Sequence, residues 1–250
     1  PWGAFHYGTT TNPPMYDSIV FNISQCTSPV PIDLISDYTT VDTNGVVDSL
    51  NTYAHFTGTV FSIDFDGNSG YSFYIHDGTG GINVYRSSDL SGYTGPMRGD
   101  SIEVFGTILQ YFGLTEILPD SLFLLKQNVP LPEPTIRTNL GEDDESELVL
   151  IENVSLVIPT QWNNSGSGFN VDVTDGVNYF VLRIDNDCNI FGTAPPLGLF
   201  DVVGVTGQFD GSYPYTTGYQ LWPRDTNDIT PISVDVTFQV DLSTQPINIT

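Results

Sequence analysis

The sequence is poor in basic residues. Its 250 residues include 30 Asp and Glu against 6 Lys and Arg, a formal net charge of −24, and Lys126 is its single lysine. A surface this acidic repels phosphate backbones, because counterion release requires basic side chains. We therefore expect nucleic acid to be a disfavoured partner. The charge predicts solubility in an extracellular medium or, alternatively, divalent-cation binding.

Cysteine, histidine and long apolar runs are also scarce. Cys26 and Cys188 lie far apart and fit no metal motif, so a disulfide in an oxidising compartment and two unpaired thiols stay as alternatives. The three histidines, His6, His55 and His76, lack metal-ligand spacing. No nucleophile elbow or phosphate-binding loop is present, so we expect no catalytic residues and no enzyme. No apolar run is long enough to span a membrane.

Glycine, proline and alternating apolar residues are plentiful. The stretch 71–116 begins with YSFYIH, turns at Asp77-Gly78 and resumes with INVY. Period-two alternation between Gly and Asp turns is typical of antiparallel strands. With 24 Gly, 17 Pro and many β-branched residues, the sequence predicts an all-β protein.

This strand pattern occurs twice. The first copy spans residues 46–128, with strands expected at 54–64, 71–76, 82–85 and 99–110, then one that begins at Leu114 and a closing segment at 122–125. The second copy spans 148–230, with strands expected at 149–158, 168–173, 179–184, 200–207 and 219–223. A proline-rich and acidic linker, 129–147, joins them. The repetition predicts two copies of one five-stranded fold.

Two segments lie outside the copies. We expect residues 1–45 to form an ordered arm that packs on the first copy or on a neighbouring molecule. In residues 231–250, polar residues alternate with Ile232, Val234, Val236, Phe238, Val240 and Leu242. A lone one-sided strand needs a partner, so we interpret it as a donor strand for another subunit or as the start of a further domain. The chain begins at Pro1, which fits a mature form without its signal peptide or a fragment.

Both copies resemble the OB-fold in their strand order, in the turn after the first strand and in the Gly99-Asp100 lead into a strand with an internal Gly106. Phrases such as YSFYIHDGTGGINVY and GYQLWPRDTNDI are similar to paired OB-like modules of secreted or cell-surface proteins of Bacteroidetes-type bacteria. The resemblance implies a non-catalytic, extracellular protein. It implies two tandem OB-like five-stranded barrels with an N-terminal arm and an unpaired C-terminal strand.

The candidate ligand-binding residues are aromatic, with one arginine. An OB-fold binds ligands on the face of its second and third strands. Together with a similar surface in the second copy, that face offers Tyr74, Tyr85, Arg86, Trp162, Tyr219 and Trp222. Such residues stack on bases or sugar rings. Because the chain is acidic, polysaccharide or protein is the expected ligand, and packing in the core is the alternative role.

Two loops rich in Asp and Asn are candidate calcium sites. Oxygen ligands alternate in Asp64, Asp66 and Asn68, and again in Asp185, Asp187 and Asn189. Calcium requires about six to eight oxygens, so each loop would need further ligands. The alternative is a turn that its own side chains stabilise by hydrogen bonds.

Two functional hypotheses follow. The first is a structural or adhesive protein that forms a surface filament or layer by strand donation, with copies of itself or other surface proteins as partners. The alternative is an accessory module that binds carbohydrate or protein for a larger secreted enzyme, such as a nuclease or a glycan-active enzyme.

Overall fold

The computed structural model describes residues 30–67, 69–93 and 95–233. The aromatic part of the arm with Cys26, the loop residue Asn68 and the predicted donor strand from Val234 onward lie outside the described residues. Both sheets belong to the unit Ile32–Thr250, one of two into which the chain divides. In the part that the structure describes, no helix has the length and apolar character of a membrane span.

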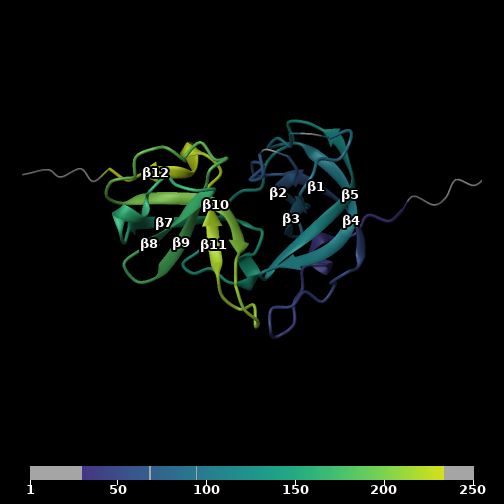
Figure 1. The fold of residues 1–250 in the computed structure, drawn as a ribbon, viewed down its shortest axis with the longest axis horizontal. Helices are drawn as coiled ribbons and strands as arrows, with labels where there is room; N and C mark the ends of the chain where they lie inside the picture. The colour runs from purple at the N-terminus through teal and green to yellow at the C-terminus, as the bar shows by residue number, and fades with distance from the viewer. Residues whose placement is uncertain (1–29, 68, 94, 234–250) are drawn as a thin grey trace, which may run out of the picture. The chain divides into compact units, whose positions relative to one another are not determined.

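The first five strands close into a barrel (Figure 1). Their order is β1–β2–β3–β5–β4, and β4 pairs back onto β1. Neighbouring strands are antiparallel except β3 and β5, which run parallel. The strands are β1 (Tyr53–Val60), β2 (Tyr71–His76), β3 (Gly81–Arg86), β4 (Ser101–Tyr111) and β5 (Leu114–Lys126).

Alternation of side chains builds the core of this barrel. Every second residue of β4 is buried from Ile102 to Ile108, and β2 places Tyr71, Phe73 and Ile75 in the same core. Burial of one such side chain stabilises the fold by about 1.5–3 kcal/mol. The described part of the arm packs here too: Ile35 in the short helix η1 (Ile35–Asp37) is fully buried.

The last strand of the barrel runs from Leu114, where a strand was predicted to begin, through the closing segment predicted at 122–125. β5 is continuous, and it contains Pro119 opposite Gly106. The register shifts between Phe105 and Gly106 of β4. Such an irregularity accommodates a proline that cannot donate a ladder hydrogen bond.

A tight turn joins β4 to β5. Its residues Phe112 and Gly113 both have positive φ, 49° and 96°, as hairpin turns of this kind require. A side chain at position 113 would also collide with Gln208 of the second sheet. Glycine thus allows both the turn and the close approach of the two sheets.

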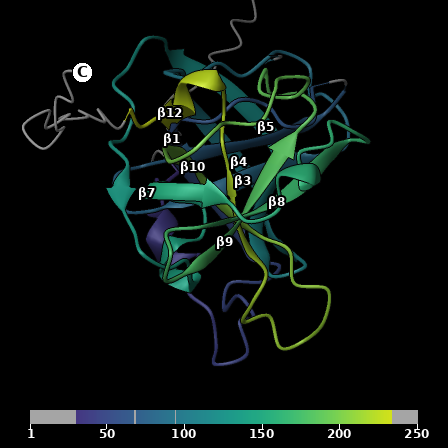
Figure 2. The same ribbon diagram turned by 90° about the vertical axis from the view of Figure 1, so that its left-hand side faces the viewer.

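The second sheet has seven strands in the order β12–β10–β11–β9–β8–β7–β6, and β10 also pairs with β7. Figure 2 turns this part of the molecule toward the viewer. β9 and β11 run parallel, as do β6 and β7. The strands are β6 (Thr135–Ile136), β7 (Leu148–Leu156), β8 (Gly168–Thr174), β9 (Tyr179–Asp185), β10 (Phe200–Gln208), β11 (Tyr219–Trp222) and β12 (Ile229–Pro231). Short helices in this region are η2 (Glu142–Asp144), η3 (Pro159–Gln161) and η4 (Thr226–Asp228).

The second sheet has its own core. Trp162, predicted to lie on a ligand surface, is instead 7% exposed, with its ring centroid 5.6 Å from that of Phe169 and its Nε1 donating to the Thr193 carbonyl at 3.0 Å. Its position after a turn gave no indication of this burial. Cys188 is buried in the same core, and burial raises the pKa of its thiol to about 11.

Candidate functional site

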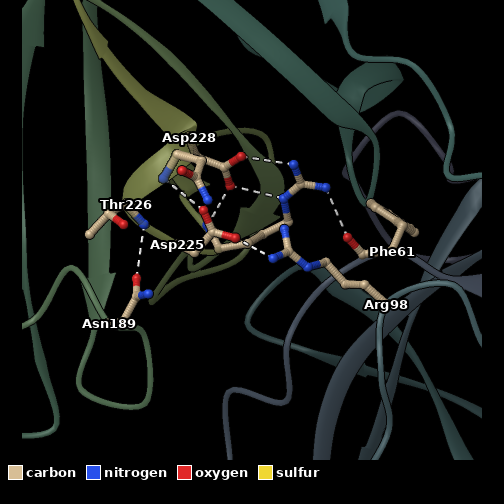
Figure 3. Close-up of polar contacts among 8 residues, drawn as sticks. Phe61, Arg98, Asn189, Asp225, Thr226 and Asp228 are labelled. Atoms are coloured by element: carbon tan, nitrogen blue, oxygen red, sulfur yellow. Dashed lines mark hydrogen bonds and ion pairs between the residues drawn. The ribbon is translucent and has the colours of Figure 1, made fainter.

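Two arginines join the sheets at one end of their contact (Figure 3). The buried Arg224 guanidinium makes hydrogen bonds of 2.8 and 2.9 Å with the Asp228 carboxylate, and its Nη1 donates to the Phe61 carbonyl of the barrel at 2.9 Å. Arg98, from the loop before β4, forms an ion pair with Asp225. We call Phe61, Arg98, Arg224, Asp225 and Asp228 the arginine clamp.

An apolar cluster continues this contact. Barrel side chains meet second-sheet side chains in a core that contains Phe61, Phe65, Tyr74, Leu114, Leu148 and Val205. The Trp222 ring packs edge-on against Phe65, with 5.2 Å between ring centroids. The two sheets therefore hold one another by burial as well as by charge.

Strand alternation places a second set of barrel side chains toward the second sheet. While Phe73 and Ile75 enter the barrel, Tyr74 belongs to the core shared with the second sheet. Tyr74 pairs with Asn83 on β3, and Asn83 pairs with Glu116 on β5. This register sets the three residues in one row across the barrel wall, because paired residues lie on the same face of a sheet.

The second sheet supplies the facing wall. Asn170 on β8 and Arg183 on β9 are register partners, and the Arg183 guanidinium lies over the Trp222 ring, 5.6 Å from its centroid. Gln208, at the end of β10, is 5% exposed and donates through Nε2 to two carbonyls. Its Oε1 and the Trp222 Nε1 are buried and lack a hydrogen-bond partner among the described residues.

Between these walls lies a cavity of about 440 Å³, which we call the aromatic groove. Tyr111, Phe209 and Tyr85 are its exposed aromatic side chains, at 55%, 52% and 38% exposure. The volume is in the range of ligand-binding pockets. The groove is lined by Ser72, Tyr74, Tyr85, Tyr111, Leu114, Glu116, Asn170, Arg183, Gln208, Phe209, Gln220 and Trp222.

Glu116 is the single acidic residue in this lining. It is 7% exposed, and burial raises the pKa of its carboxyl to about 8. Glu145 lies nearby and accepts a hydrogen bond from the Thr115 N–H at 2.9 Å; burial also raises its pKa to about 8. Burial, and then both carboxyls, raise the pKa of Tyr74. Glu116 in the wall and the neighbouring Glu145 are therefore both largely uncharged near neutral pH.

The structure brings together three of the six predicted ligand residues. Tyr74, Tyr85 and Trp222 line the aromatic groove. Arg86 does not line it and donates to the Pro119 carbonyl at 2.8 Å, while the Tyr219 hydroxyl donates to Glu142 at 2.9 Å. Their role in binding stays a prediction.

The two acidic loops lie next to each other. Asp187 accepts a hydrogen bond from the Gly67 N–H at 3.3 Å, and Asp64 accepts from the N–H groups of Asp66 and Ser72. Asn189 accepts from the Thr226 N–H at 2.9 Å, at the start of η4 (Figure 3). Burial, opposed by a hydrogen bond from Asp187, raises the pKa of Asp185 to about 6.

The side-chain hydrogen bonds in these loops are of the kind expected from the alternative prediction, in which each loop is a turn that its own side chains stabilise. No group of three or more His, Cys, Asp or Glu within residues 30–67, 69–93 and 95–233 is arranged to hold a metal ion. The role of the loops as calcium ligands stays a prediction.

Several residues of the groove were missed in the sequence. Tyr111 is the last residue of β4 and Phe209 directly follows β10, and Arg183 had been assigned only to a strand. Glu116 could have been recognised in the sequence, because its carboxyl lies between Leu114 and Ile117 in an apolar strand. A charged residue in such a strand indicates either a solvent-facing position or a site.

No family model matches the chain. A search of curated proteins finds similarity to the endonuclease YhcR of Bacillus subtilis, with 28% identity over 168 residues. The match covers 63% of this chain and 13% of that protein, so the chain corresponds to a small part of the relative's length.

Two solved structures show low structural similarity to this chain. The tetrameric p202 HIN2 structure has a TM-score of 0.32 and 11% identity, over 69% of this chain and 90% of that one. A murine DNA binding protein bound with double-stranded DNA has a TM-score of 0.31 and 10% identity, over 74% of this chain and 99% of that one.

The match to an endonuclease corrects two predictions. The chain was predicted to be a structural, adhesive or filament-forming protein or, as the alternative, a module that binds carbohydrate or protein for a larger secreted enzyme such as a nuclease. The relative is an endonuclease, which contradicts the structural role and the expected ligands. Nucleic acid was predicted to be a disfavoured partner, and a nuclease acts on nucleic acid. The prediction about nucleic acid rested on the net charge of −24, which describes the whole chain and not any one surface of it.

Proposed function

We propose that this chain is a non-catalytic nucleic-acid-binding region that holds nucleic acid for a nuclease. The observation that carries the proposal is the aromatic groove, in which exposed aromatic rings stand beside Arg183 and polar side chains. Aromatic rings and an arginine are the groups on which bases stack. The similarity to an endonuclease over 168 residues supports the same ligand class.

The proposal includes a tandem OB-like architecture. The order β7–β8–β9–β11–β10 repeats the order β1–β2–β3–β5–β4. The parallel pair β9–β11 corresponds to β3–β5, and the β10–β7 pairing corresponds to β4–β1. OB-folds bind ligands on the face of their second and third strands, and here β2, β3, β8 and β9 all contribute to the groove.

Binding of fluorescent DNA, followed by anisotropy with millimolar Mg²⁺ present, tests this function. We expect Tyr111→Ala with Phe209→Ala to weaken binding about tenfold or more, because each stacked base is worth about 1–3 kcal/mol. The matched control is Tyr53→Ala, which removes a ring of 57% exposure outside the groove and should leave binding unchanged. The DNA should remain uncut on a denaturing gel.

Each alternative outcome has a clear meaning. Absence of binding to single-stranded and duplex DNA alike would overturn the proposed function. Equal losses for the groove variant and for Tyr53→Ala would place the binding surface elsewhere. Cleaved DNA would show that the chain is itself catalytic.

A further inference from the structure

The positions of the six basic residues restrict how this chain can bind nucleic acid. Three are in ion pairs with carboxylates: Arg98 with Asp225, Arg137 with Asp144, and Arg224 with Asp228. Lys126 is exposed on β5, and neither it nor Arg86 lines the groove. Arg183 alone of the six lines the groove, so no stripe of cations is available to follow a phosphate backbone.

The groove instead offers rings and hydrogen-bonding groups. Tyr85, Tyr111 and Phe209 expose their rings to it. The buried Gln208 lines it with an Oε1 that has no partner among the described residues, and Glu116, which is 7% exposed, lines it as well. Duplex DNA hides the faces of its bases, whereas a single strand can stack them on protein rings.

We infer that the aromatic groove binds an unpaired base of a single strand, with the base stacked on the exposed rings and its edge against Glu116 and Gln208. This inference rests on the proposed function and names its substrate class. A protonated carboxyl both donates and accepts a hydrogen bond. Base edges present donors and acceptors side by side, so this contact tolerates different sequences.

The same arrangement makes binding dependent on pH. Burial keeps Glu116 protonated until its pKa of about 8 is exceeded, and then it can only accept hydrogen bonds. The titratable and charged groups around it are Tyr74 from β2, Tyr85 from β3, Glu145 from the segment before β7 and Arg183 across the groove. Two ionised carboxylates would also repel the phosphates of a bound strand.

Anisotropy with a labelled single strand of about 12 nucleotides, within the span of known single-strand sites, tests the inference. Its duplex and an RNA of the same sequence are the comparison probes. We expect the single strand to bind at least about tenfold more tightly than the duplex, with little salt dependence because few phosphates are neutralised. Binding should weaken about tenfold from pH ~6.5 to pH ~9, and Glu116→Gln, which keeps a donor and an acceptor, should reduce that dependence without abolishing it, because Glu145 still titrates in this range.

The outcomes separate the inference from the proposed function. Equal or tighter binding of duplex would overturn the inference and leave nucleic-acid binding intact, whereas no binding of any probe would overturn both. An identical pH dependence in wild type and Glu116→Gln would exclude Glu116 from the base edge. Tighter binding of DNA or of RNA would identify which single strand is preferred.

Discussion

At one end of the contact between the sheets, the arginine clamp pairs each buried charge with an opposite charge. Arg224 and Asp228 have side chains 8% and 7% exposed and are joined through two nitrogens and both carboxylate oxygens. At the other end, Glu116 in the wall of the aromatic groove and the nearby Glu145 are buried without a cation partner among the described residues.

The difference indicates separate roles for the two ends. A buried ion pair with complete hydrogen bonding fixes geometry, and removing one partner is costly. A buried acid without a partner destabilises the fold in its charged form and stays protonated instead. We interpret the clamp as the part that orients the sheets and the groove wall as the part kept available for a ligand.

The largest effect is expected from breaking the clamp. Asp228→Ala leaves the Arg224 guanidinium buried without its counter-charge, so the free energy of unfolding should fall by about 3–5 kcal/mol. Urea unfolding followed by tryptophan fluorescence measures this loss. The control Glu152→Ala removes an exposed carboxylate of β7 and should change stability by less than about 0.5 kcal/mol. A similar small change in both variants would mean that the clamp does not hold the sheets.

An intermediate effect, of opposite sign, is expected at the groove. The pKa of Glu116 is raised from 4.5 to about 8 in the folded state, so the native protein retains a proton that the unfolded chain releases. Stability therefore falls as pH rises from about 4.5 to about 8. Glu116→Gln should raise the free energy of unfolding by roughly 2 kcal/mol at pH ~8 and by little at pH ~5.

Unfolding curves at the two pH values, compared with those of Glu133→Gln, check this prediction. Glu133 is exposed, so its substitution should leave the slope of stability against pH unchanged. Glu145 titrates in the same range and remains in the variant, so the slope should decrease without disappearing. A Glu116→Gln variant less stable than wild type at pH ~8 would contradict the view that the carboxyl is destabilising there.

The strands of both sheets could be predicted from the sequence because alternation is a local property. The expected strand at 168–173 corresponds to β8, and that at 200–207 to β10. The groove could not be predicted in the same way. Tyr74 and Glu116 are 42 positions apart and become neighbours through two strand registers, which depend on the whole barrel.

The clamp shows the same limit over a longer distance. Arg98 and Asp225 are 127 positions apart, and neither lies in a motif that indicates a partner. The net charge misled for a related reason: it counts every carboxylate equally, although Asp225 and Asp228 are neutralised by arginines and Glu116 by a proton. Charge in a sequence predicts solubility and long-range attraction better than it predicts a particular site.

The smallest effect is expected where a third charged contact joins the sheets. The His76 Nε2, at the end of β2, lies 3.2 Å from the Glu147 carboxylate, and these side chains are 17% and 29% exposed. The hydrogen bond with Glu147 raises the pKa of His76 above 6.5, so the contact stabilises the fold below about pH 6.5 and is lost as pH rises through the folded-state pKa. Exposure to solvent limits its contribution to about 0.5 kcal/mol.

An NMR titration of the His76 ring should show its pKa decrease toward 6.5 in Glu147→Gln, whereas an unchanged pKa would remove Glu147 as the cause. A positive result would place this partly exposed pair between the two ends, since its charge is paired as in the clamp and its pKa is raised as in the groove.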